Sequence, residues 1–219
     1  MTKKEKIATT IFTIINIIVV LISIYLIIET YITKNDPYDR LSSHYASAII
    51  SFLPILYLLI FKKDSNPFIV GLSTIYIFLA VFLGASLNFY NLYGNIHYDK
   101  LIHVFMGYCS ALIGLFILIK SKSIISLKTP ITILFIFSFA LMIAGIWEML
   151  EFSKDMITGS EVQGKRLLTI SGIEVIDVGE TIFDMIANLT GAIIFSLQYL
   201  FHQKTKKCYL MKFYLHYLK

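Results

Sequence analysis

The segment 7-IATTIFTIINIIVVLISIYLII-28 decides the fold, because it is a long apolar run without a charged residue. About 20 consecutive apolar residues are enough to cross the hydrocarbon core of a bilayer as a helix. The run follows Lys3, Lys4 and Lys6, as it would in a secretory signal peptide. It is longer than the apolar core of about 7–15 residues in such a peptide, and no small-x-small cleavage motif follows. The segment therefore predicts an uncleaved first membrane span.

The rest of the chain shares this apolar character. Of its 219 residues, 57% are hydrophobic and 15% are charged, whereas soluble domains carry about 25% charged residues. This composition argues against a soluble globule and predicts one polytopic membrane domain over residues 1–219. The predicted spans are 7–28, 45–61, 68–87, 101–119, 131–150 and 177–201. The expected fold is an all-α integral membrane protein, a bundle of about six transmembrane helices.

Lysine and arginine are divided unevenly between the two ends of these spans. With the N-terminus inside, most of the 19 basic residues fall on the cytoplasmic side. Because cytoplasmic loops carry an excess of Lys and Arg, the N- and C-termini are expected in the cytoplasm, with a basic tail at 202–219. The net charge of +5 is explained by this topology, and we expect no nucleic-acid partner.

Polar residues in the sixth span form the first part of a candidate site. Glu180, Asp184, Asn188 and Gly191 follow Asp177 at intervals of three or four residues, which places them on one helical stripe. A carboxylate within a span costs roughly 2.5–3.5 kcal/mol on insertion scales, so it usually faces a protein interior or a water-filled cavity. An interhelical hydrogen bond that fixes packing is the alternative, and for Asn188 alone it explains the residue equally well.

Two other spans bring acids to the same outer side. Glu148 and Glu151 are neighbours on one face near the end of the fifth span. Asp99 and His103 share a face at the start of the fourth span, and this face continues through Gly107. Small residues at such positions let helix backbones approach closely. The topology therefore predicts an acidic, histidine-containing site in the outer half of the bundle.

This set of residues suits more than one chemistry. Imidazole and carboxylate groups can ligate a divalent cation or relay protons, and no other cofactor is indicated. The candidate catalytic residues are Asp99, His103, Glu148, Glu151, Glu180 and Asp184. The candidate metal ligands are His103, Glu148 and Asp184, and the candidate substrate-binding residues are Lys165, Arg166 and Asn188.

The loop at 153–176 is the longest predicted outer connection. It contains an alternating stretch from Leu168 to Val175, which is typical of a short extended segment or hairpin. Such a segment could act as a lid over the polar site or lie on the lipid headgroups.

The polar motifs resemble those of a known family. Tyr98-Asp99-Lys100-Leu101-Ile102-His103, Trp147-Glu148 with Glu151, and Glu180-Thr181-Ile182-Phe183-Asp184-Met185 are similar to the bacterial YjdF-type family of membrane-spanning proteins. The resemblance covers roughly 98–192, and Glu180-Thr181 stands where that family usually has Asp-Thr. It implies the bacterial cytoplasmic membrane and the same polar site, without a settled activity.

A more distant resemblance links the two ends of this region to the VanZ-like proteins. The Asp99-Lys100-x-x-His103 start and the Asp184-x-x-x-Asn188-x-x-Gly191 end carry it, and Gln163 and Arg166 align only loosely. This resemblance implies a link to glycopeptide-antibiotic tolerance at the cell envelope, without a known reaction.

Three functions remain open from the sequence. The first is an outward-facing enzyme or lipid-binding protein that handles a lipid headgroup or phosphate with a divalent cation. The second is a small proton- or cation-coupled transporter, although no inner-half acids and no inverted repeat complete a route. The third is a structural membrane protein whose polar residues fix helix packing. The expected partners are the lipid bilayer and a lipid or envelope substrate, and the sequence indicates neither an oligomeric state nor whether the protein is an enzyme.

Overall fold

The structure is a computed structural model that describes residues 3–36, 40–61, 66–123, 127–158, 166–168, 170, 174–176 and 178–218. Within these ranges, six helices are long and apolar enough to cross a membrane. They are Glu5–Thr33, Leu41–Phe61, Pro67–Ser86, Tyr98–Lys120, Thr129–Ile157 and Val178–Thr205. The predicted six-span, all-α architecture is confirmed. The side of the membrane that each terminus faces stays a prediction.

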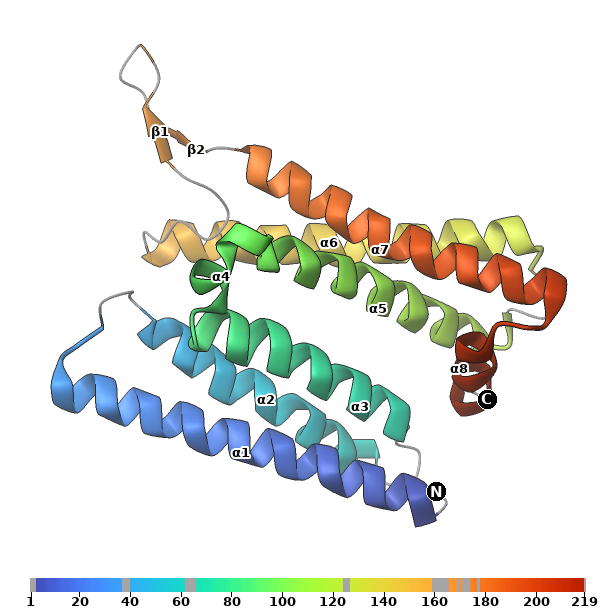
Figure 1. Cartoon of the computed structure of the whole chain (residues 1–219), viewed down its shortest axis with the longest axis horizontal. Coiled ribbons are helices and arrows are strands. Elements are labelled where there is room, and N and C mark those ends of the chain that lie inside the picture. Colours follow the sequence, from blue (N-terminus) through green and yellow to red (C-terminus); the bar gives the residue numbers. More distant parts are fainter. Residues whose placement is uncertain are drawn as a thin grey trace. The chain divides into compact units, whose positions relative to one another are not determined.

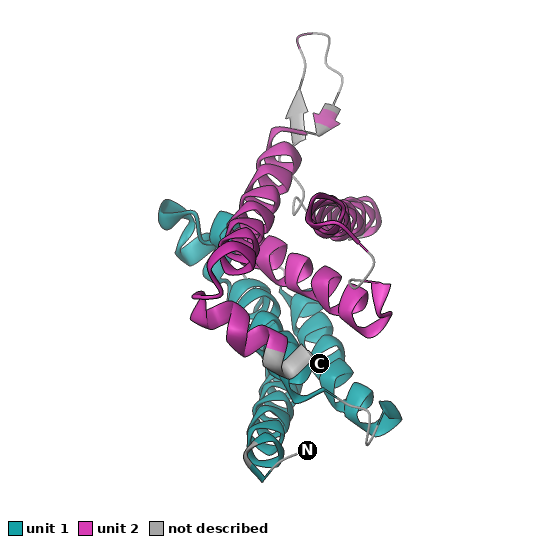
Figure 2. Ribbon diagram, turned by 90° about the vertical axis from the view of Figure 1, so that its right-hand side faces the viewer, with its two compact units in different colours: residues 1–102 teal, residues 103–219 magenta. Residues whose placement is uncertain are grey.

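The chain forms two compact units, Met1–Ile102 and His103–Lys219, which Figure 2 shows in different colours. The boundary between them passes through helix α5 (Tyr98–Lys120), which is continuous. The predicted single domain over 1–219 stays a prediction.

Unit 1 begins with the helices α1 (Lys3–Thr33), α2 (Leu41–Phe61) and α3 (Pro67–Tyr76). Figure 1 shows α1, α2 and α3 side by side, and α1 packs against both α2 and α3. Asp36 starts α2 by accepting the backbone N–H groups of Arg40 and Leu41. Asn66 caps α3 by accepting the N–H of Phe68, with Pro67 at the first helical position.

Buried polar pairs join the helices of unit 1. Asn16 on α1 donates to Thr74 Oγ1 on α3 at 2.7 Å, and Ser23 donates to Ser47 on α2 at 2.9 Å. Apolar side chains such as Leu21, by contrast, are exposed. This arrangement suits helices surrounded by lipid, where packing and interhelical hydrogen bonds hold helices together because lipid tails are as apolar as the side chains.

The third span does not remain an α-helix. After α3 the chain continues as a π-helix, η2 (Ile77–Ser86), and Leu87 N–H still bonds the carbonyl of Phe82, five residues earlier. Ser86, at its end, lies 2.7 Å from His44 Nδ1 on α2. The sequence analysis missed this change, because the apolar composition of a span does not distinguish an α-helix from a π-helix. The short helices α4 (Phe89–Leu92) and η3 (Gly94–Ile96) then lead into α5.

Unit 2 contains α5 from His103 onward, α6 (Thr129–Thr158), α7 (Val178–Thr205) and α8 (Tyr209–Leu218). The strands β1 (Arg166–Leu168) and β2 (Glu174–Ile176) pair antiparallel, with Leu167 opposite Val175. The hairpin alternative for the loop at 153–176 is therefore confirmed, and the side of the membrane on which it lies stays a prediction. Figure 1 shows the two strands ahead of the start of α7. The lid and the headgroup alternatives both stay predictions.

Several helices differ in length from the predicted spans. Helix α6 continues past the predicted end at 150 to Thr158, and α7 continues to Thr205. The predicted basic tail at 202–219 contains α8, which the sequence analysis missed because it interpreted the tail from its charge alone.

The Asn16–Thr74 hydrogen bond gives a stability prediction. Thr74→Val removes the hydroxyl at nearly constant size and leaves the buried Asn16 amide without this acceptor. We expect a loss of about 0.6 kcal/mol of unfolding free energy, the average for an interhelical hydrogen bond in a membrane. Thr10→Val is the matched control, because the exposed Thr10 hydroxyl donates to the Lys6 carbonyl of its own helix and not to another helix among the described residues. Reversible unfolding in mixed detergent micelles measures both changes, and equal losses would contradict the assignment.

Candidate functional site

One face of α7 is buried along most of its length. The buried residues are Asp184, Asn188, Gly191, Ala192, Phe195, Ser196, Tyr199 and His202. Apart from the adjacent pairs Gly191–Ala192 and Phe195–Ser196, they recur every three or four residues and so make a single stripe, as predicted for Asp184, Asn188 and Gly191. The stripe continues well beyond the acidic end, so α7 packs against neighbouring helices along most of its length.

Helices α5 and α7 are in backbone contact at two glycines. A Cβ atom on Gly107 of α5 would collide with the backbone carbonyl of Asn188, and one on Gly191 of α7 would collide with the carbonyl of Val104. Small residues permit such close approach between membrane helices. The two reciprocal contacts fix the register of α5 against α7. They therefore also fix the relative positions of the polar residues that lie one turn closer to the start of each helix.

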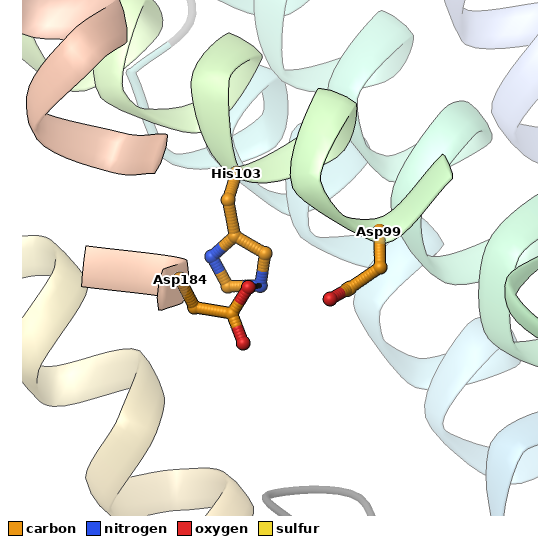
Figure 3. A group of neighbouring side chains, drawn as sticks. All are labelled: Asp99, His103 and Asp184. Atoms are coloured by element: carbon orange, nitrogen blue, oxygen red, sulfur yellow. Dashed lines mark ion pairs between the residues drawn. The ribbon is translucent and has the colours of Figure 1, made fainter. Parts of the chain in front are cut away.

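This register places His103 beside Asp184. His103 Nε2 lies 3.6 Å from Asp184 Oδ1, and the two side chains are only 5% and 7% exposed. Figure 3 shows the imidazole of α5 and the carboxylate of α7 pointing toward one another. The two residues predicted to share the site therefore lie next to each other within unit 2.

Asp99 completes a group of three potential ligands. It lies on α5 one turn before His103, so the continuous helix fixes their mutual position. One ligand atom from each of Asp99, His103 and Asp184 lies within 4.8 Å of the others. The Asp99 side chain is 40% exposed and pairs with Lys100 at 3.1 Å. The group therefore has a buried wall of His103 and Asp184 and an accessible edge at Asp99.

Helix α6 carries two buried acids, Glu148 and Asp155, and the half-buried Glu151. Glu148 is 5% exposed, and both of its carboxylate oxygens are shielded from solvent. Glu151 accepts a hydrogen bond of 2.6 Å from Trp147 Nε1. Asp155, which the sequence analysis did not single out, is also buried. Its spacing of seven residues from Glu148 was the signal that could have identified it.

Helix α6 packs against α7, but Glu148 is not one of the three residues whose ligand atoms come together. The predicted role of Glu148 as a metal ligand, with that of Glu151 as a catalytic residue, stays a prediction. Glu180 is exposed in the first turn of α7, where a negative charge interacts favourably with the helix dipole. The predicted catalytic role of Glu180 stays a prediction.

Asn188 lies one turn beyond Asp184 on the buried stripe and is 1% exposed. Neither its side-chain nitrogen nor its side-chain oxygen has a hydrogen-bond partner among the residues that the structure describes. Burial of an unpaired amide is unfavourable, so simple packing does not explain this residue.

The other predicted substrate-binding residues are Lys165 and Arg166. Lys165 lies outside the described residues, and Arg166 begins β1. Asp177 of the predicted stripe also lies outside the described residues.

The sequence analysis also missed a buried histidine in unit 1. His44 is buried on α2 beside Ser86, and Arg40 Nη1 donates to the Ser86 carbonyl at 3.4 Å. No acidic motif surrounds His44 in the second span, so the sequence offered no signal for this cluster.

The helices, their apolar surfaces and the buried polar residues define a multi-pass helical membrane protein. The chain belongs to the family described as "Predicted membrane protein (DUF2238)", whose sequence model matches residues 11–205. The YjdF-type resemblance is consistent with this family, whereas the comparisons do not show the VanZ-like similarity. Searches of curated proteins and of solved structures each gave no match. The family match includes Asp99, His103 and Asp184.

The two glycine contacts give a prediction for the α5–α7 pair. Gly107→Ala or Gly191→Ala inserts a methyl group against the partner backbone, so the helices must separate or shift. We expect each variant to lose about 1–3 kcal/mol of stability, as in other overpacked interiors. Thermal unfolding of the purified protein in detergent measures the change.

Gly145→Ala on α6 is the matched control, because a Cβ atom there meets nothing within 4 Å. This variant should melt at the parent temperature or slightly above, since alanine favours a helix over glycine by roughly 0.5–1 kcal/mol. If all three variants had the same stability, the close contact of α5 and α7 would be wrong.

Proposed function

We propose that this protein binds a divalent cation through Asp99, His103 and Asp184, and that the cation holds a phosphate or a lipid headgroup at the outer face of the membrane. The observation that carries the proposal is the 3.6 Å separation of His103 Nε2 and Asp184 Oδ1 in a buried setting.

This separation suits two ligands of one metal ion better than a direct hydrogen bond. Hydrogen bonds from nitrogen to oxygen span about 2.7–3.2 Å. Two ligands at about 2.1 Å from a tetrahedral ion lie about 3.4 Å apart. The three ligand atoms lie within 4.8 Å of one another, so they would have to move closer together to share one ion at such bond lengths.

The electrostatics of the site favour a positive partner for Asp184. A carboxylate that is 7% exposed loses most of its hydration, and this cost is offset only by a close, well-placed charge. A divalent ion supplies that charge and would be shared by two carboxylates and a neutral imidazole. The mixed oxygen and nitrogen ligands suit Zn²⁺, Mn²⁺ or Fe²⁺ better than Ca²⁺ or Mg²⁺.

Three protein ligands leave room for a further ligand on the ion. Metal sites that act on substrates keep such an open position, which a water molecule or a substrate oxygen occupies. Asp99 is the exposed member of the group, so this position is expected on its side. Lys100, which pairs with Asp99, adds a positive charge for an anionic group. Should the bound group react, Glu148 is the proposed general acid or base.

We also propose that the N- and C-termini face the cytoplasm of a bacterial cell and that the site faces outward. The distribution of lysine supports this orientation. Lys204 lies in the last turn of α7 and Lys206 and Lys207 follow it, whereas Asp184 lies near the start of the helix.

A structural role for the polar residues is the second candidate. The contacts of Gly107 with Asn188 and of Gly191 with Val104 favour it, because they show tight packing beside the site. The two roles differ in one respect: packing requires the shape of Asp184, whereas cation binding requires its charge.

Asp184→Asn therefore separates the two roles. The variant keeps the side-chain shape and removes the charge, and we expect Zn²⁺ and Mn²⁺ affinity to fall at least about tenfold with a near-parental melting temperature of the metal-free protein. Isothermal titration of the purified full chain measures the affinity. Glu29→Gln, which removes an exposed carboxylate from α1, is the control and should bind as the parent does. Unchanged affinity in Asp184→Asn would refute the cation site.

A second experiment tests the anionic ligand. Inorganic phosphate should bind the Mn²⁺-loaded protein and should not bind the metal-free protein, because the ion provides the main attraction. Lys100→Gln should weaken phosphate binding severalfold and should not weaken Mn²⁺ binding, since Lys100 competes for Asp99. Equal phosphate binding with and without Mn²⁺ would contradict this part of the proposal.

A further inference from the structure

The end of α7 turns the chain sharply into α8. Lys206 has a positive φ of 55° and donates its N–H to the His202 carbonyl at 2.8 Å, which closes the helix. Figures 1 and 2 both show α8 leaving the direction of α7. Because α7 is a candidate membrane span, a helix that turns away at its end is placed to lie along the membrane surface.

One face of α8 is fixed to the rest of unit 2. Met211 is fully buried, and the Tyr214 ring stacks against Phe195 of α7 with a centroid distance of 6.5 Å. The Tyr214 hydroxyl lies 3.1 Å from that of Tyr108 on α5, which in turn lies 2.7 Å from Gln198 Oε1. These contacts determine which side of α8 remains outward.

The outward side of α8 is apolar. Tyr209, Leu210 and Phe213 are 85%, 51% and 48% exposed. At 100° per residue they occupy one side of the helix, distinct from that of Met211 and Tyr214. Such a face is expected to be covered in a membrane protein.

The surroundings of this face are basic. Lys204, Lys206, Lys207 and Lys212 are exposed, and Lys212 Nζ lies 5.7 Å from the centre of the Tyr209 ring. The sequence contains no Asp or Glu after Asp184. The charge of this end of the molecule is therefore complementary to an anionic surface.

We propose that α8 is an interfacial helix that binds anionic lipid headgroups. Tyr209, Leu210 and Phe213 enter the boundary between headgroups and acyl chains, and Lys206, Lys207 and Lys212 contact the lipid phosphates. An apolar face flanked by lysine is the pattern of helices that lie in the membrane plane. A second copy of the chain could also cover an apolar face, but the uniformly basic surroundings would repel a like surface. The site is independent of the cation site at the other end of α7.

Hydrogen exchange of the full-length protein in lipid nanodiscs tests the proposal. One set of discs contains phosphatidylcholine alone, and the other contains phosphatidylcholine and phosphatidylglycerol. The amides of α8 should exchange at least tenfold more slowly in the anionic discs, and high salt should remove most of this difference because it screens surface charge.

The variant Lys206→Gln/Lys207→Gln/Lys212→Gln should lose the difference between the two lipids. The matched control Lys120→Gln/Lys122→Gln/Lys128→Gln also removes three exposed lysines of unit 2 and should keep it. Exchange of α5 amides in the same samples shows that each variant is folded. Equal exchange rates of the α8 amides in the two kinds of disc would overturn the proposal. Protection that appears only with two protein copies per disc would assign the face to a second copy.

Discussion

The backbone contact between α5 and α7 is the constraint on which the proposed site depends. Gly107 and Gly191 have no side chain, so the two helices approach until each glycine touches the backbone of the other helix. One turn from this contact, His103 and Asp184 face each other and are almost fully buried. Without the glycines, the helices would lie farther apart and a single ion could not reach both side chains.

The same contact explains why polar residues are tolerated in spans this apolar. An isolated carboxylate in a membrane is costly, but beside an imidazole and the proposed cation its charge would be neutralised at a fixed position. The bundle therefore combines two kinds of polar contact. In unit 1, neutral pairs such as Asn16 with Thr74 join helices. In unit 2, charged groups lie close together at the proposed site, where a bound ligand would compensate their charge.

The sequence predicted the spans well because length and apolar composition determine them directly. It also predicted the face of α7 that carries Asp184 and Asn188, since helical spacing defines a face. It also placed Asp99 and His103 on one face of a helix, and the structure brings both close to Asp184. Helical spacing alone could not show which residues of separate helices come together, so the metal-binding role of Glu148 stays a prediction. The π-helix at Ile77–Ser86 and helix α8 were missed because both depend on local hydrogen bonds or on tertiary contacts that composition does not reveal.

The central claim is that one divalent ion joins His103 to Asp184. X-ray absorption at the zinc edge of the Zn²⁺-loaded full-length protein tests it most directly, because scattering from an imidazole ring identifies a histidine ligand and its distance. The account predicts one imidazole nitrogen at about 2.0–2.1 Å together with oxygen ligands, and loss of the imidazole signal in His103→Gln. A spectrum with oxygen ligands alone, or one that His103→Gln leaves unchanged, would contradict the claim.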